Sequence, residues 1–412
     1  MNLTDIIARN LSGKATGLPS WCSAHPETLS AILHSYRADT APILIEATCN
    51  QVNQFGGYTG MTPADFVRFV QGLARAEDID PARLILGGDH LGPNPWRTEP
   101  AVIAMAKARD MVAGYVAAGF SKIHLDASMA CAGEALAEPE MAARAADLCA
   151  VAEAAAQGRP LHYIIGTEVP VPGGETEHRD ALAVTTPDAV RRTHDLHRMA
   201  FAARGLEAAF ARVIGVVVQP GVDFGNDQII GYDPAQAGGL AALAPALQGA
   251  AFEAHSTDYQ TQAALAALVR DHFALLKVGP ELTFAYRQAV MALERLETLL
   301  RLPSSGVTAA LLAAMRARPA DWRPYVEAGP EEETMMLYGL SDRLRYYWPD
   351  PSVQSAQTRL FAALRHAKPA PGLVAQVTGG LVTDCDPATL PETVIRRMVG
   401  AVVHKYRIAT GA

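Results

Sequence analysis

The sequence predicts a (β/α)8 TIM barrel with a helical C-terminal extension. Over residues 17–301, short apolar runs alternate with Ala- and Leu-rich stretches of helical periodicity, and this strand–helix unit occurs eight times. The apolar runs are almost uninterrupted, as in strands of a parallel sheet that helices cover on both faces. Eight such units are the number that closes a barrel. A doubly wound open sheet is the rival, and it is disfavoured because no GxGxxG motif opens the first unit.

The order of elements follows from these runs. The predicted strands are Gly17–Ala24, Ile43–Cys49, Arg83–Gly88, Lys122–Asp126, His162–Thr167, Arg212–Gln219, Ala251–His255 and Phe273–Val278. The predicted helices cover residues 25–36, 62–77, 99–118, 141–157, 186–204, 234–247, 261–271 and 283–301. Thr-Pro pairs at residues 62–63 and 186–187 are typical helix starts, with Thr as the cap and Pro in the first turn.

After Arg301 the pattern changes. Residues 302–306 read as a linker, and residues 307–412 read as helices without a strand signal. We therefore expect a barrel over residues 1–301 and a helical region over residues 302–412 that packs on it.

Composition excludes several classes of protein. The 412 residues carry 35 Lys and Arg against 43 Asp and Glu, and half are hydrophobic, which is typical of a soluble globular chain and not of a disordered one. No basic block is present to meet nucleic acid, and no apolar run is long enough for a membrane span. The five scattered cysteines and the absence of a signal-peptide pattern favour the cytoplasm.

Nearly every predicted strand ends in a hydrogen-bonding or ionisable side chain. The active site of a barrel lies at this end of the strands, and buried polar groups cost stability unless they are paired. The gathering of such groups therefore indicates function. The candidates are Ser23, Glu46, Gln51, Asn53, Asp89, His90, His124, Asp126, Glu168, Gln219, His255, Asp258 and Lys277.

These residue types suggest metal-assisted chemistry. We expect His90, Glu168 and His255 to bind a divalent metal, with zinc as the best match to such ligands. His124 is either a fourth ligand or a histidine of the core. Asp89 and Asp126 would act as general acid and base.

The remaining candidates are assigned to the substrate. These residues are Ser23, Glu46, Gln51, Asn53, Gln219, Asp258 and Lys277. Basic groups at this end are few, namely Lys277, Lys122 and Arg97, which favours a free sugar over a phosphate. The aromatic residues 346–348 are expected to pack within the helical region.

Long motifs carry a resemblance to a known family. They are SAHP (23–26), IEATCNQVNQFGGYTGMTP (45–63), LGGDHLGPN (86–94), AGFSKIHLDASM (118–129), GTEVPVPGGE (166–175), VVQPGV (217–222), EAHSTDYQT (253–261), LKVGPELTFA (276–285) and LSDRLRYYWP (340–349). With these motifs the chain resembles, over almost its whole length, the accessory (Z-type) subunit family of class II D-tagatose-1,6-bisphosphate aldolase.

The resemblance implies a (β/α)8 barrel and a role in tagatose or galactitol catabolism. It also implies that Asp89 moves protons and His90 binds zinc, as in the Asp-His pair of catalytic class II aldolases. One departure is Gln219, which stands where a further zinc histidine is expected. Some members are labelled tagatose 6-phosphate kinase, but the nearest match to a P-loop, residues 12–15, lacks its leading Gly and its Ser or Thr.

Two hypotheses of different classes follow. In the first, the barrel binds a metal and a ketohexose or its phosphate and performs chemistry at C3–C4, either aldol cleavage or C4 epimerisation of fructose and tagatose. In the second, the chain is a non-catalytic subunit that stabilises a separate catalytic aldolase, with the helical region as its docking surface. In both, we expect a homo-oligomer.

Overall fold

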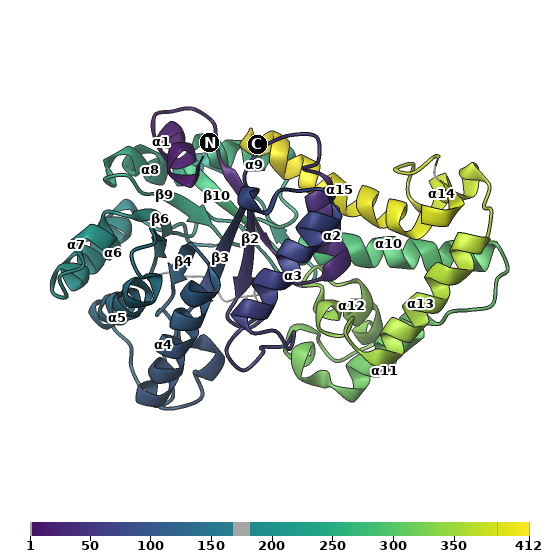
Figure 1. Ribbon diagram of the computed structural model, residues 1–412, viewed down its shortest axis with the longest axis horizontal. Helices are drawn as coiled ribbons and strands as arrows, with labels where there is room; N and C mark the ends of the chain where they lie inside the picture. Colours follow the sequence, from purple (N-terminus) through teal and green to yellow (C-terminus); the bar gives the residue numbers. More distant parts are fainter. Residues whose placement is uncertain (1, 168–181, 385, 412) are drawn as a thin grey trace.

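The computed structural model describes residues 2–167, 182–384 and 386–411. Eight parallel strands form a barrel in the order β1-β10-β9-β6-β5-β4-β3-β2. The barrel is closed because the last strand in this order, β2, pairs with the first, β1. Helices surround the barrel, and a helical C-terminal region extends from it (Figure 1). The predicted (β/α)8 barrel with a helical extension is confirmed, and the open sheet is wrong because the two end strands pair with each other.

Each predicted strand overlaps an observed barrel strand. The barrel strands are β1 (Leu18–Cys22), β2 (Ile43–Thr48), β3 (Leu84–Leu91), β4 (Lys122–Leu125), β5 (His162–Ile165), β6 (Val213–Val217), β9 (Ala251–Ala254) and β10 (Phe273–Val278). A short antiparallel pair, β7 (Asp223–Phe224) and β8 (Ile229–Ile230), follows β6 and was not predicted. It lies in the long connection between β6 and the next helix, on the side where the strands end.

The helices follow the predicted alternation and add several short segments. They are α1 (Leu3–Leu11), α2 (Pro26–His34), α3 (Pro63–Ala76), α4 (Ala101–Ala118), α5 (Glu138–Ala156), α6 (Pro187–Ala202), α7 (Glu207–Phe210), α8 (Pro234–Leu243), α9 (Gln262–Arg270), α10 (Pro280–Leu299), α11 (Val307–Ala317), α12 (Glu332–Tyr338), α13 (Pro351–His366), α14 (Pro371–Val377) and α15 (Leu390–Thr410). None of the helices in the described ranges is both long and apolar enough to cross a membrane.

The C-terminal helix α15 completes the ring of helices around the barrel. It packs against β1 and lies between α9 and α2 (Figure 1). Helix α10 directly follows the eighth barrel strand. It packs against α15 and also contacts α13 and α14. A domain boundary at residue 301 stays a prediction. The ring of helices around the barrel includes α15, which lies beyond that residue.

The interior of the barrel is apolar at one end and charged in the middle. Three apolar residues of α1, Leu3, Ile6 and Ile7, pack into a cluster with inward-facing residues near the strand starts, such as Leu44 and Leu275. Side chains alternate between the two faces of a strand, so the residue two positions further along also points inward. On β2 and β10 these residues are Glu46 and Lys277, so charged side chains lie in the barrel interior between the apolar cluster and the strand ends.

Candidate functional site

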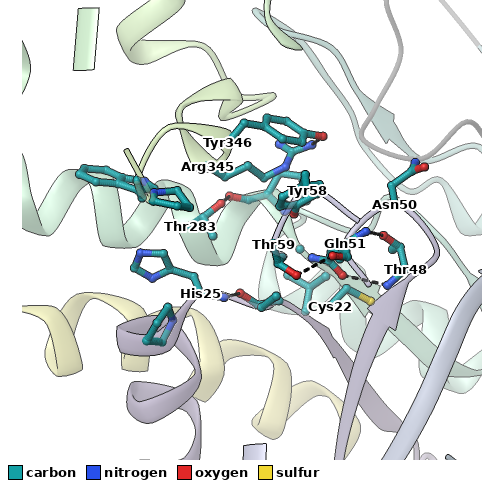
Figure 2. A pocket seen from close by; sticks show the side chains of 18 of the residues that line it. Cys22, His25, Thr48, Asn50, Gln51, Tyr58, Thr59, Thr283, Arg345 and Tyr346 are labelled. Carbon is teal, nitrogen blue, oxygen red and sulfur yellow. Dashed lines mark hydrogen bonds between the residues drawn. The ribbon is translucent and has the colours of Figure 1, made fainter. Parts of the chain in front are cut away.

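A cavity of about 570 Å³ opens at the ends of the barrel strands. Residues from the strand ends form its floor, and residues from the C-terminal region form part of its wall (Figure 2). Its lining includes Ser23, Gln51, Tyr58, Asp89, His90, His255, Asp258, Lys277, Thr283, Arg345 and Tyr346. The cavity is large enough for a small metabolite.

Three histidines meet at the ends of the barrel strands, and two of them, His90 and His255, line the cavity, whereas His124 lies behind its lining. The ring centroids of His90 and His124 lie 5.2 Å apart, those of His90 and His255 4.9 Å, and those of His124 and His255 5.3 Å. All three side chains are buried. His90 and His124 lie on the neighbouring strands β3 and β4, whereas His255 directly follows β9, which is separated from them by β5 and β6, so His255 meets the other two across the barrel.

A carboxylate orients each histidine. Asp126 lies 2.8 Å from Nδ1 of His90, and Asp89 lies 2.9 Å from Nδ1 of His124. Glu253 lies 3.1 Å from Nε2 of His255. Metal-binding histidines use their second nitrogen in this way, because the carboxylate fixes the ring and makes the ligand nitrogen more basic.

The cluster fits a divalent metal ion. Asp89, His124, Glu253 and His255 offer ligand atoms that all lie within 4.8 Å of one another. The Nε2 atom of His124 is buried and has no hydrogen-bond partner among the described residues, an arrangement that costs free energy unless a ligand occupies it. Imidazole and carboxylate together suit divalent transition metals.

Four charged side chains form a layer under the histidines. Nζ of Lys122 lies 2.5 Å from Glu46 and 2.6 Å from Glu253, and all three side chains are fully buried. Lys277 pairs with Glu46 and lies 2.5 Å from Asp89. Two lysines thus neutralise two glutamates, and Lys277 connects the layer to Asp89.

Burial and charge set the protonation of these groups. Burial lowers the pKa of His255 to about 3, so its ring is neutral at neutral pH, the form that binds a metal. Burial also opposes ionisation of Asp89, but His90 and Lys277 outweigh it and hold the pKa of Asp89 well below its usual range. Burial lowers the pKa of Lys277, but Asp89, Glu253 and Glu46 outweigh it and hold the pKa well above its usual value, so this lysine stays charged.

Comparisons with known proteins agree with this geometry. Residues 3–411 match the family described as D-tagatose-1,6-bisphosphate aldolase subunit GatZ/KbaZ-like. The chain belongs to the GatZ/KbaZ-like family. It is 48% identical to the D-tagatose 6-phosphate 4-epimerase of Agrobacterium fabrum, over 99% of this chain and 98% of that protein. It is 49% identical to the D-tagatose-1,6-bisphosphate aldolase subunit GatZ of Klebsiella pneumoniae, over 91% of this chain and 90% of that protein.

A solved structure shows that the fold is shared with a close relative. The crystal structure of a probable tagatose 6 phosphate kinase from Sinorhizobium meliloti 1021 matches with a TM-score of 0.85 at 45% identity, covering 95% of this chain and all of that one. In this GatZ/KbaZ-like chain, the P-loop-like residues 12–15 follow α1 and precede β1, at the end of the barrel opposite the cavity. They therefore do not line the described site.

Four of the residues assigned to the substrate lie in the cavity wall. Ser23 and Gln51 are two of them, and each accepts a backbone N–H, from His25 at 3.2 Å and from Thr48 at 2.8 Å. Asp258 accepts the N–H groups of residues 279 and 281, at the start of α10, and burial raises the pKa of its carboxyl to about 7. Lys277 is the fourth. Their contact with substrate stays a prediction.

The other three residues assigned to the substrate, Glu46, Asn53 and Gln219, have protein contacts that account for their positions without a substrate. Glu46 belongs to the charged layer. Asn53 donates to the carbonyl of residue 49 at 3.0 Å and accepts two N–H groups of its own loop. Gln219 accepts the N–H groups of residues 221 and 222 and so closes a turn after β6. Asp126 likewise does not line the cavity, and Glu168 lies outside the described residues.

The backbone around Asp126 requires glycine at position 92. A Cβ atom on Gly92 would lie 1.6 Å from the carbonyl oxygen of Asp126. We expect Gly92→Ala to lower the free energy of unfolding by about 1–3 kcal/mol, because the two segments must move apart. The shift should also displace Asp126 from His90 and reduce activity; chemical denaturation and a kinetic assay measure both.

Gly72 provides a matched control for this variant. It lies inside α3, and a Cβ atom added there would meet no other atom within 4 Å. Gly72→Ala should therefore leave activity unchanged and stabilise the helix by up to about 1 kcal/mol. A Gly92→Ala protein as stable and active as the parent would contradict the tight contact.

Sequence reasoning missed four residues of the site. Glu253 lies inside β9 and was not a candidate, and Lys122, the first residue of β4, was expected only as a basic group near the substrate; their spacing of two from His255 and His124 was the available signal. Arg345 and Tyr346 line the cavity, although residues 346–348 were expected to pack within the helical region and that region was considered only as a docking surface. No local pattern indicates that the C-terminal region folds over the barrel mouth.

Proposed function

We propose that the chain is a metal-dependent enzyme that epimerises a ketohexose of the tagatose type at C4. The observation that carries this proposal is the meeting of three carboxylate-oriented histidines with Asp89 at the ends of the barrel strands, where Asp89, His90 and His255 line the cavity. The relative named as a 4-epimerase supports it, since the similarity extends over nearly the whole of both chains. We further propose zinc as the metal and the cytoplasm as the location, the latter because the four described cysteines are unpaired.

The residues that would hold the metal are those of the histidine cluster. His124 and His255, with carboxylates from Asp89 or Glu253, present the nearest ligand atoms, and His90 stands beside them with its ring fixed by Asp126. Glu168, predicted as a ligand, stays a candidate. When bound there, a divalent ion would act as a Lewis acid toward a substrate carbonyl.

The chain's own side chains can supply the proton transfers. A base removes the proton of the C4 hydroxyl, the C3–C4 bond breaks, and its electron pair passes to C3 to give an enediolate and an aldehyde. If the aldehyde rotates, C3 attacks its other face, and the proton returns to the C4 oxygen. Asp89 is the base that we assign, because it is ionised, lines the cavity and touches Lys277. Asp126 positions His90 instead.

Metal removal should abolish the activity. The test uses the purified protein with metal analysis, then measures interconversion of fructose and tagatose and of their 6-phosphates before and after treatment with a chelator. We expect stoichiometric divalent metal, loss of turnover without it, and recovery on adding Zn²⁺ back. A metal-free protein with no turnover of any of the four sugars after metal addition would refute the proposal.

A second function has one specific observation in its favour. The GatZ relatives are named as aldolase subunits and cover about nine tenths of this chain at nearly the same identity as the epimerase. In this alternative, the chain stabilises a separate catalytic barrel and has no turnover. Co-purification with a second barrel protein, together with an inactive isolated chain, would favour it. In either case, self-association of the chain stays a proposal that size-exclusion chromatography can test.

A further inference from the structure

A single-turn helix of the C-terminal region places a guanidinium group in the wall of the cavity. The 3-10 helix Arg343–Tyr346 carries Arg345, which stacks on the ring of Tyr346 at 4.7 Å and donates to its hydroxyl at 3.1 Å. The same guanidinium donates to the carbonyl groups of Ser341 and Asp342. These contacts fix the side chain in one orientation.

Arg345 has no acidic partner within ion-pair distance in the described parts of the chain. Neighbouring arginines do pair: Arg287 lies 3.0 Å from Asp342, and Arg323 lies 2.6 Å from Glu332. Cations that are removed from water are normally paired, because an isolated charge loses its hydration without compensation. A guanidinium that lines a cavity without an acid is therefore suited to a ligand that brings the negative charge.

The surroundings of Arg345 add positive potential. The guanidinium of Arg343 also lies against the aromatic group, 4.6 Å from the ring centroid of Tyr346. Burial raises the pKa of the Tyr346 hydroxyl, but the two guanidinium groups outweigh it, and the net pKa lies below its ordinary value. A group that is anionic at neutral pH would be attracted to the same place.

Hydrogen-bonding capacity remains for such a ligand. A guanidinium has five N–H groups, and the contacts given above use three of them. The ring of Tyr58 packs on Tyr346 at 4.6 Å, and Thr283 lies nearby in the cavity wall (Figure 2). Planar guanidinium groups bind phosphate through two parallel hydrogen bonds, which makes phosphate the best match.

We infer that Arg345 binds the phosphate group of a ketose phosphate and selects it over the free sugar. This inference rests on the proposed function for the other end of the ligand, where Asp89 and His255 line the same cavity. It reverses the expectation of a free sugar, which depended on Lys277, Lys122 and Arg97. Lys122 is fully buried between two glutamates and has no access to a ligand.

Binding measurements test the role of Arg345 in phosphate recognition without requiring turnover. Calorimetry would compare three ligands of similar chain length: D-glucitol, D-glucitol 6-phosphate and D-gluconate. The metal-loaded parent protein should prefer the phosphate ester. Arg345→Ala should weaken binding of the ester about 10- to 100-fold and leave glucitol unchanged, since charge-assisted hydrogen bonds account for that range. Arg345→Lys should fall between, because it keeps the charge but loses the planar fork.

Arg365→Ala is the matched control. Arg365 forms an exposed ion pair with Glu392 in the same helical region and does not line the cavity, so this variant should bind all three ligands like the parent. Equal weakening of glucitol and its phosphate, a preference for gluconate, or unfolding of both Arg345 variants would overturn the inference. Absence of sugar turnover with retained phosphate selectivity would instead refute only the proposed epimerisation.

Discussion

Asp89→Asn should reduce the rate of C4 epimerisation about a thousand-fold. The substitution keeps the size of the side chain but removes the negative charge that we assign to proton transfer, and general acid–base groups contribute about 10²- to 10⁴-fold. Asp89 is buried, lies 2.9 Å from His124 and 2.5 Å from Lys277, and has a strongly lowered pKa. Steady-state kinetics of the metal-loaded variant measure the effect on kcat.

Metal content separates the loss of a base from the loss of the metal site. Asp89 also belongs to the ligand cluster, so the variant must be assayed at saturating metal and its bound metal counted. Asp188→Asn serves as the control, because Asp188 is exposed on α6, pairs with Arg191 and does not line the cavity. An Asp89→Asn protein that is fully loaded with metal and turns over within ten-fold of the parent would rule out Asp89 as the base.

Lys122→Met should lower the free energy of unfolding by about 3–5 kcal/mol. Lys122 lies between Glu46 and Glu253 inside the barrel, and its removal leaves two buried carboxylates with only Lys277 to neutralise them. Breaking a buried ion pair by removing one partner typically has a cost of this size, because the remaining charge stays buried without compensation. Equilibrium unfolding in guanidinium chloride provides the measurement.

A double variant shows that the effect arises from charge and not from packing. Lys122→Met combined with Glu253→Gln removes one cation and one anion, so its loss of stability should be smaller than the sum of the two single losses. Arg191→Met, which removes an exposed ion pair, should change stability by less than about 1 kcal/mol. Additive losses in the double variant would show that Lys122 and Glu253 do not depend on each other.

Much of the fold could be predicted because it is encoded locally. The apolar runs gave all eight barrel strands, and the Thr-Pro pairs marked the starts of α3 and α6. The N-terminal helix α1 was missed, although Asn2 and Asp5 form a capping box at its start. The position of α15 in the ring of helices could not be predicted, because the sequence places it far beyond α10, which was expected to close that ring.

The candidate site was predicted in part for the same reason. Asp89, His90 and His255 could be found because a parallel barrel brings all its strand ends to one face, whatever the partners of each residue. The partners themselves could not be assigned from a single strand. Asp126 was expected to transfer protons, but it lies against His90 and away from the cavity lining, a relation that depends on how β3 and β4 pair.

The sequence by itself determined the barrel, the face that carries the site and most of the polar side chains on that face, because strand periodicity and strand ends are properties of short segments. Only the tertiary structure decided which charges neutralise each other and which remain free. Barrel closure places Lys122 between Glu46 and Glu253, and the return of the C-terminal region places Arg345 over the mouth. Those contacts join segments that are distant in the chain, and their energy depends on distances that no local pattern contains.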